Sequence, residues 1–242
     1  MKNFLLIISV LLLCGVLFNS AQAQNQNKID SLLNVLKRAK EDTNKVKILN
    51  ALSYRLQLKG DNDKSEKYAN EALQLSEKIN YRKGIGRAYN NLGILNDYRG
   101  NYPEALKNHF ASLKINEEIG DKKGAADSYC NIAGINILQA NYPEGLKYIF
   151  ASLRIFEELD NKGGISSCYS NIAAIYSREG NHAEGLKKFS SSLKINQEIG
   201  DKYEVSNSYI NIGTEYWHLR NYPEALKNYF AALKIKEEIG DK

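Results

Sequence analysis

The amino-acid sequence predicts an all-α protein, a right-handed α-solenoid of stacked antiparallel helix pairs. Three observations support this prediction. A long motif recurs every 40 residues, each copy carries apolar residues at helical spacing, and glycine-containing turns separate the helices. A composition of 43% hydrophobic and 25% charged residues excludes collagen-like and strongly disordered chains.

The first 23 residues have the organisation of a secretory signal peptide. A basic start at Met1-Lys2 precedes an apolar run over residues 4–18, and Ala21-Gln22-Ala23 forms a small-residue cleavage site. We therefore expect cleavage after Ala23 and a mature protein that is periplasmic or extracellular.

Two other interpretations of this segment fit its residues less well. A membrane anchor needs about 18 to 20 apolar residues, whereas the run over 4–18 is shorter and is interrupted by a serine and a glycine. Lipid attachment at Cys14 would require a small residue before it, where Leu13 stands. Later in the chain, the longest charge-free stretch, 128–143, contains four amide side chains, so we expect no membrane-spanning segment there.

An Asn-Tyr-Pro-Glu motif or a variant of it begins one helix of each repeat. Segment 101–122 recurs over 221–242 with only three differences, and related copies start at Asn141 and Asn181. The prolines share one phase of the repeat, and a first helical turn tolerates proline because its missing N–H is not needed there. Asn101, with a glutamate three residues later, forms a start that resembles a capping box.

This helix is amphipathic and ends at a glycine. Its apolar residues recur at steps of about three and four, as in the copy that contains Ala105, Leu106, Phe110, Leu113 and Ile119. Gly120 ends the helix because glycine accepts the left-handed conformation, and Asp121 is a suitable N-cap for the helix that follows.

The other helix of each repeat has four characteristic positions on one face, at spacings i, i+3, i+4 and i+7. In successive repeats these are Tyr89, Leu92, Gly93 and Asn96, then Tyr129, Ile132, Ala133 and Asn136, then Tyr169, Ile172, Ala173 and Tyr176, then Tyr209, Ile212, Gly213 and Tyr216. The small residue at i+4 allows the partner helix to approach closely. A short turn such as 99–101 joins the two helices, which are therefore antiparallel.

The predicted organisation is a signal peptide over 1–23, a capping helix over 24–44 and five repeats. The repeats span 45–84, 85–124, 125–164, 165–204 and 205–242. A compact helical bundle is the alternative, but a bundle does not require one strict period. One helix pair cannot bury its apolar face alone, so stacked repeats are expected to share a continuous core.

These residues resemble the tetratricopeptide repeat (TPR) family. The family pattern of an aromatic residue, Leu-Gly, a turn glycine, a tyrosine and an alanine is matched by Tyr89, Leu92-Gly93, Gly100, Tyr102 and Ala105. The period of 40 exceeds the usual 34, as in the long repeats of kinesin light chains and Leu-Gly-Asn repeat proteins. The resemblance implies a TPR superhelix that binds a protein or an extended peptide.

No motif indicates catalysis, a metal site or a cofactor. Gly84-Ile85-Gly86 starts like a dinucleotide-binding fingerprint, but Tyr89 occupies the third glycine position and no strand is expected before it. The three histidines are scattered, and adjacent glutamates such as Glu117-Glu118 point about 100° apart on a helix. The sequence therefore predicts a protein that is not an enzyme, without metal or cofactor.

The predicted mature chain has two cysteines, Cys130 and Cys168. Equivalent helices of neighbouring repeats should lie about 8 to 10 Å apart, and a two-residue offset within the repeat turns these side chains about 200° from each other. Because a disulfide needs Cα atoms within about 7 Å, we expect free, half-buried thiols.

The net charge of +5 is mild for a chain with 33 basic and 28 acidic residues. Lysines and glutamates interleave along the whole chain, whereas nucleic-acid binders usually concentrate basic residues on one stripe. We therefore expect solvated helix faces and no nucleic-acid partner.

A column of asparagines precedes the Leu-Gly pair or its equivalent in four repeats, at Asn91, Asn131, Asn171 and Asn211. Two interpretations remain open. The amides either hydrogen bond one repeat to the next, or they form a ladder that faces a ligand. The ladder is what resemblance to the superhelix of O-linked N-acetylglucosamine transferase implies, because an asparagine at this place there holds the backbone of an extended peptide.

The same helical face presents side chains of varied charge and size on either side of the column. The predicted groove therefore also includes Arg87, Asp127, Tyr98, Arg178 and His218. A regular ladder with variable flanks suits a groove that holds any main chain and selects its sequence through the flanks.

The sequence thus predicts an exported scaffold that binds a protein or peptide in a concave groove. The alternative is the periplasmic sensory portion of a truncated membrane signalling protein, with a histidine kinase, nucleotide cyclase or transcription-regulator output. No polar capping helix follows the last repeat, so we expect its apolar face over 230–239 to fray or to self-associate.

Overall fold

The computed structural model describes residues 25–240, in which every regular element is an α-helix and no strand occurs. Residues 25–36 are helical, and they precede α2 (Thr43–Leu58), α3 (Asn62–Lys78), α4 (Arg82–Tyr98), α5 (Tyr102–Glu118), α6 (Lys122–Leu138), α7 (Tyr142–Glu158), α8 (Lys162–Arg178), α9 (His182–Ile199), α10 (Lys202–His218) and α11 (Tyr222–Ile239). The predicted signal peptide and its cleavage site lie outside the described residues. Within 25–240, none of the helices combines the length and the apolar character that crossing a membrane requires.

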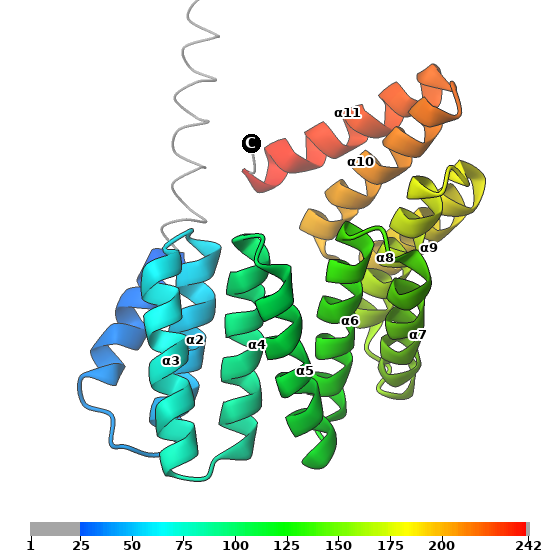
Figure 1. The fold of residues 1–242 in the computed structure, drawn as a ribbon. Helices are drawn as coiled ribbons and strands as arrows, with labels where there is room; N and C mark the ends of the chain where they lie inside the picture. The colour runs from blue at the N-terminus through cyan, green and yellow to red at the C-terminus, as the bar shows by residue number, and fades with distance from the viewer. Residues whose placement is uncertain (1–24, 241–242) are drawn as a thin grey trace, which may run out of the picture.

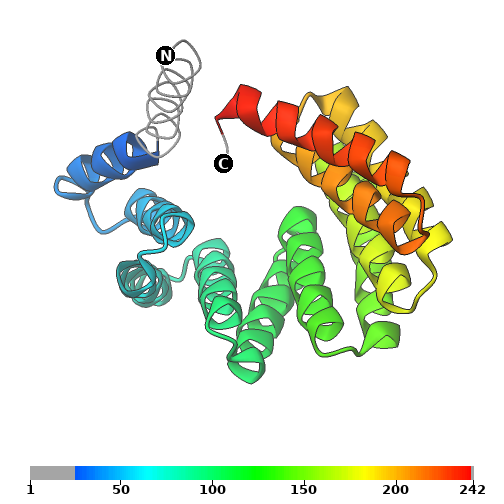
Figure 2. The same ribbon diagram turned by 90° about the horizontal axis from the view of Figure 1, so that it is seen from above.

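Successive helices form antiparallel pairs, and the pairs stack into a curved array (Figure 1). Seen from above, the array is an open arc with residues 25–36 at one end and α11 at the other (Figure 2). The first helices of neighbouring pairs, α2, α4, α6 and α8, also contact one another, whereas the second helices pack chiefly against first helices. The first helices therefore form the inner layer of the arc. The predicted fold class, an all-α solenoid of stacked helix pairs, is confirmed.

The helix ends follow the turn residues of the repeat. Gly120 adopts a left-handed φ of 69°, and the Asp121 side chain accepts a hydrogen bond from the main-chain N–H of Gly124 at 3.1 Å, which caps α6. The predicted side-chain cap at Asn101 is wrong, because its amide makes no capping hydrogen bond although α5 begins at the next residue. Pro103 removes one of the two N–H groups that an N-cap side chain normally binds.

Small residues on the first helices admit large rings from the second helices. A Cβ atom added to Gly93 would lie 2.6 Å from the His109 ring, and one added to Gly213 would lie 2.8 Å from the Tyr229 ring. Neither glycine can therefore gain a side chain unless the ring moves. This close approach of the paired helices is what the small residue at the i+4 position predicts.

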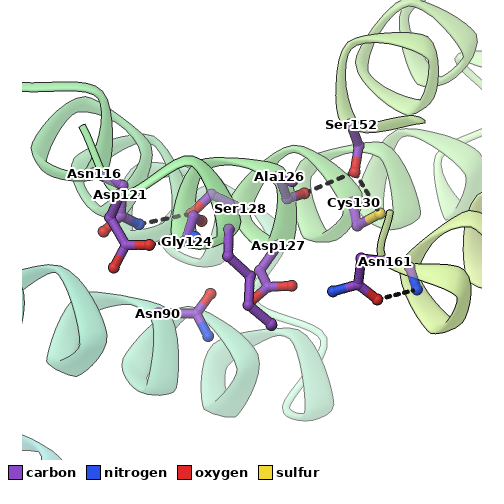
Figure 3. A network of polar contacts seen from close by, with 12 residues as sticks. Asn90, Asn116, Asp121, Gly124, Ala126, Asp127, Ser128, Cys130, Ser152 and Asn161 are labelled. Carbon is purple, nitrogen blue, oxygen red and sulfur yellow. Dashed lines mark hydrogen bonds and ion pairs between the residues drawn. The ribbon is translucent and has the colours of Figure 1, made fainter. Parts of the chain in front are cut away.

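Buried polar clusters join neighbouring repeats. At the junction of α5 and α6, the Asn116 side-chain amide donates to the hydroxyl oxygens of Ser112 at 3.2 Å and Ser128 at 3.5 Å (Figure 3). The equivalent amide at the junction of α9 and α10, Asn196, also bonds two buried serines. Because buried polar groups are stable only when they are hydrogen bonded, these clusters hold each helix in register with the next.

Candidate functional site

The first two members of the asparagine column bridge neighbouring first helices. Asn91 on α4 is only 3% exposed, and its Nδ2 donates to the main-chain oxygen of Asn50 at 3.1 Å and to its Oδ1 at 3.2 Å. Asn131 on α6 donates through Nδ2 to Oδ1 of Asn90 at 2.9 Å. In this half of the array, the amides therefore connect α2 to α4 and α4 to α6.

The last two members of the column are free. Asn171 on α8 and Asn211 on α10 are half-exposed, and neither side chain makes a hydrogen bond within residues 25–240. Each amide therefore presents both a donor and an acceptor to solvent.

The residue 41 positions earlier decides whether an amide of the column is bonded. Asn50 and Asn90 provide amide partners for the first two members. Cys130 and Ser170 stand at the equivalent position for the last two, and their thiol and hydroxyl contact serines of α7 and α9 instead. The sequence signal for this division is the change from asparagine to cysteine and serine in the neighbouring column.

The flanking residues nearest the N-terminus differ in how far they are engaged. Arg87 and Tyr98 on α4 are exposed, and the tyrosine side chain is 72% exposed. Asp127 on α6 is half-buried and forms an ion pair with Lys123 on the same helix, with a distance of 2.8 Å between Oδ2 and Nζ. Arg87 and Tyr98 are therefore the side chains most accessible to a ligand here.

The flanking residues of the last two repeats contact other helices. Arg178 on α8 donates from Nη1 to the main-chain oxygen of Ile137 at 3.3 Å, near the end of α6, where the helix dipole favours a cation. His218 on α10 stacks on His182 of α9, with ring centroids 4.5 Å apart and an angle of 4° between the ring planes. The predicted site residues thus follow the array and do not converge on one point.

A buried glutamate beside the histidines is a feature that sequence reasoning missed. Glu215 on α10 is 1% exposed, and its Oε2 lies 2.9 Å from Nδ1 of His182. The preceding repeats place buried Leu95, Ile135 and Ile175 at this position, so a charged residue in an apolar column was the available signal. Among residues 25–240, no three His, Cys, Asp or Glu side chains are grouped so that they could hold a metal ion.

The two cysteines lie much closer than the sequence analysis predicted. Cys130 on α6 and Cys168 on α8 are free thiols whose sulfur atoms are 3.8 Å apart. The prediction that these side chains turn away from each other is wrong. Side chains that meet across two neighbouring helices must point in opposite directions, and an offset of about 200° brings this about.

Exposed ion pairs recur in four repeats and link the start of each first helix to the end of the second. The partners are Arg82 and Glu118, Lys122 and Glu158 at 2.9 Å, Lys162 and Glu198 at 3.0 Å, and Lys202 and Glu238 at 3.0 Å. Hydrogen bonding to the lysine lowers the pKa of the glutamate in each of the three lysine pairs. These basic residues are therefore paired with acidic ones and do not form a stripe of uncompensated positive charge.

The chain matches a known family over more than half of its length. A family model described as "Tetratricopeptide repeat" matches residues 46–118 and 165–238. No curated protein is matched by the chain.

Several solved structures have a similar fold. BtubC (BKLC) from P. vanneervenii has a TM-score of 0.68 and 20% identity, and the match covers 91% of both chains. A Rap protein complexed with Competence and Sporulation Factor has a TM-score of 0.71 and 14% identity, over 90% of this chain and 72% of that one. A signal transduction ATPase with a tetratricopeptide repeat sensor from Pyrococcus horikoshii has a TM-score of 0.66 and 17% identity, over 100% of this chain and 43% of that one. At these identities, the similarity concerns the fold alone.

Proposed function

Because the chain belongs to the tetratricopeptide repeat family, whose arrays typically act as non-catalytic scaffolds, we propose that it is an exported scaffold that binds a protein or an extended peptide in its concave groove. The proposal places the ligand main chain along the first helices of the last two repeats. It assigns the protein no catalytic step.

The free amides of Asn171 and Asn211 are the observation that carries this proposal. An amide can donate to a peptide C=O and accept from a peptide N–H, whatever side chains the ligand has. Because both residues are half-exposed and unbonded, a ligand can use them without breaking a bond between repeats. Each such hydrogen bond is worth only about 0.5 to 1.5 kcal/mol net, so the flanking side chains must supply part of the affinity.

Arg87 and Tyr98 are the flanking groups best placed to select a ligand. An exposed guanidinium binds a carboxylate through paired hydrogen bonds, and an exposed phenol ring offers an apolar contact with a polar edge. Asp127 and Arg178 are already engaged within the array and should contribute less. The expected ligand is therefore an extended segment with an acidic or aromatic residue near one end.

A complex of a structural neighbour supports a binding role. The Rap protein that shares this fold is complexed with Competence and Sporulation Factor. An array of this architecture can thus hold a partner molecule. The groove residues of the present chain are assigned from its own free amides and not from that complex.

Selection from a library of short random peptides on the immobilised chain from residue 24 onward tests the proposal. We expect enriched peptides that bind wild type and bind the Asn171→Ala/Asn211→Ala variant at least about fivefold more weakly. Lys187→Ala, which removes an exposed charge from α9, serves as the control and should bind normally. If no peptide is enriched on chain that circular dichroism shows to be folded, the proposed function is wrong.

The second candidate function is the sensory portion of a membrane signalling protein. It is favoured by the alignment of the whole chain with less than half of a signal transduction ATPase that carries a tetratricopeptide repeat sensor. Immunoblotting of cell fractions separates the two proposals. A larger product in the membrane fraction would favour the sensor, whereas a periplasmic product the size of this chain would favour the scaffold.

A further inference from the structure

Two thiols meet at the junction between the third and fourth helix pairs. Cys168 on α8 is completely buried, and Cys130 on α6 is half-buried. Their sulfur atoms are 3.8 Å apart, and the hydroxyl of Ser152 on α7 lies 3.1 Å from the Cys130 sulfur (Figure 3). No other cysteine lies within residues 25–240.

This junction differs from the equivalent junctions on either side of it. Those junctions contain an asparagine amide that bonds buried serines, whereas Phe156 takes the place of the asparagine here. Cys168 likewise stands where the neighbouring junctions have Ser128 and Ser208. The Phe156 ring packs against Gly164 so closely that an added Cβ would lie 2.4 Å from it. The junction therefore lacks the amide bridge and holds a thiol pair in its place.

We propose that Cys130 and Cys168 are a redox pair that closes to a disulfide and joins the third helix pair covalently to the fourth. Packing between α7 and α8 is the least extensive among the successive labelled helices of the described chain. A bond between α6 and α8 therefore restrains the array where packing restrains it least. The bond would also lie between the bonded and the free halves of the asparagine column.

The oxidant in this proposal is a disulfide, either a small molecule such as oxidised glutathione or a protein that exchanges disulfides. The Cys130 thiol loses its proton, and the thiolate attacks one sulfur of the oxidant, which forms a mixed disulfide and releases one thiol. The Cys168 thiol then loses its proton and attacks the Cys130 sulfur, which closes the protein disulfide and releases the second thiol. The protein thus loses two electrons and two protons, and the oxidant becomes two thiols.

The environment of the pair favours Cys130 as the first nucleophile. Cys130 is the more exposed of the two, so the oxidant can reach it. The hydrogen bond with Cys168 lowers the pKa of Cys130 despite its burial, and Lys123 acts in the same direction. The same hydrogen bond and burial raise the pKa of Cys168 far above the usual value for a thiol. Cys168 is therefore suited to the second, intramolecular attack.

The geometry requires only a small movement. The sulfur atoms must approach from 3.8 Å to a bond length of about 2.05 Å. Because α6 and α8 already contact each other, side-chain rotation with a small helix shift is sufficient. A disulfide restricts the unfolded chain, so closing it should raise the melting temperature by about 5 to 10 °C.

The test uses reduced chain from residue 24 onward, which contains all the described helices and lacks Cys14. The protein is incubated with oxidised glutathione, remaining thiols are counted after denaturation, and peptide mass spectrometry is run without reductant. We expect loss of both thiols, a Cys130–Cys168 cross-linked peptide and the higher melting temperature. Cys168→Ser, which copies the neighbouring junctions, should instead stop at a glutathione adduct on Cys130.

Three results would overturn the proposal. Wild type could stop at the glutathione adduct, form only intermolecular disulfides, or keep both thiols reduced under conditions in which Cys168→Ser becomes glutathionylated. A cross-link that leaves the melting temperature unchanged would contradict the claim that it restrains the array. Cys130→Ala provides the matched control, because it should show neither adduct nor cross-link and should keep its buried Cys168 thiol.

Discussion

His109 is a buried histidine whose surroundings keep it neutral. It lies on α5 against Gly93, is 1% exposed, and has no hydrogen-bond partner for Nδ1 within the described chain. Burial lowers its pKa to about 4. Because the value in the unfolded chain is about 6.5, the unfolded state binds a proton first as the pH falls.

The contribution of His109 to the free energy of unfolding should therefore be complete above about pH 6.5. It should decrease by about 1.4 kcal/mol per unit as the pH falls from there toward 4. His109→Tyr copies the Gly213–Tyr229 pair and should remove this dependence. Urea unfolding at pH 7 and pH 5 measures the effect, and wild type should lose about 2 kcal/mol more than the variant. Equal losses would show that His109 is not held neutral by burial.

The buried Glu215 depends on His182 for its hydrogen bond. His182→Ala should lower the free energy of unfolding by about 1 to 3 kcal/mol, because the carboxyl group stays buried without this partner. The double change His182→Tyr/Glu215→Ile copies Tyr142 and Ile175 of the preceding repeat and should restore or exceed wild-type stability. Thermal melting followed by circular dichroism decides, and an unchanged melting point for His182→Ala would contradict the expected role.

Single residues also show where sequence analysis of the site stops. The 40-residue period identifies the asparagine column, because every member has the same local pattern. It does not tell whether Asn171 is bonded, because that depends on Cys130 in the adjacent helix and on where its sulfur points. The cysteine pair was missed for the same reason, since contact across two helices depends on their relative orientation.

At the scale of the helix, local signals were sufficient for most starts and ends. Gly120 and Asp121 mark the end of α5 and the start of α6, as expected. The junction of α7 and α8 could not be predicted in this way, because its packing combines Phe156 of one repeat with Gly164 of the next. Contacts between repeats depend on side-chain sizes in two separate segments.

Helix α11 should be the least protected of the second helices. Its outer residues Leu226, Phe230 and Leu233 are 55%, 66% and 51% exposed, whereas the equivalents Leu113 and Leu153 are 7% and 9% exposed. In α5 and α7, the following repeat covers this face. Hydrogen exchange of the monomer should therefore be faster across α11 than across α7. Equal protection of the two helices would mean that the exposed face does not weaken α11.

At the scale of the whole molecule, the solenoid was predictable from its period. Each pair leaves an apolar face that only the next pair can cover, so a strict repeat produces an extended curved array. The inner layer of first helices follows from this stacking. The division of the groove into a bonded and a free half was not predictable, because it arises from differences between repeats.

Export is a property of the complete chain that a mass measurement can test. The apolar run over residues 4–18 and the small residues before position 24 predict cleavage after Ala23. Mass spectrometry of the protein recovered from the periplasm or the medium should find Gln24 as the new N-terminus. Recovery of protein that retains Met1 would contradict this prediction.

The central claim is that the free half of the asparagine column binds ligand while the bonded half holds the repeats together. The most direct test measures the melting temperature and the affinity for a selected peptide on two matched double variants. Asn171→Ala/Asn211→Ala should weaken binding by about fivefold to a hundredfold with little change in melting temperature. Asn91→Ala/Asn131→Ala should lower the melting temperature by several degrees, because it breaks the bonds to Asn50 and Asn90. If instead the first variant bound the peptide as well as wild type and melted lower, the claim would be contradicted.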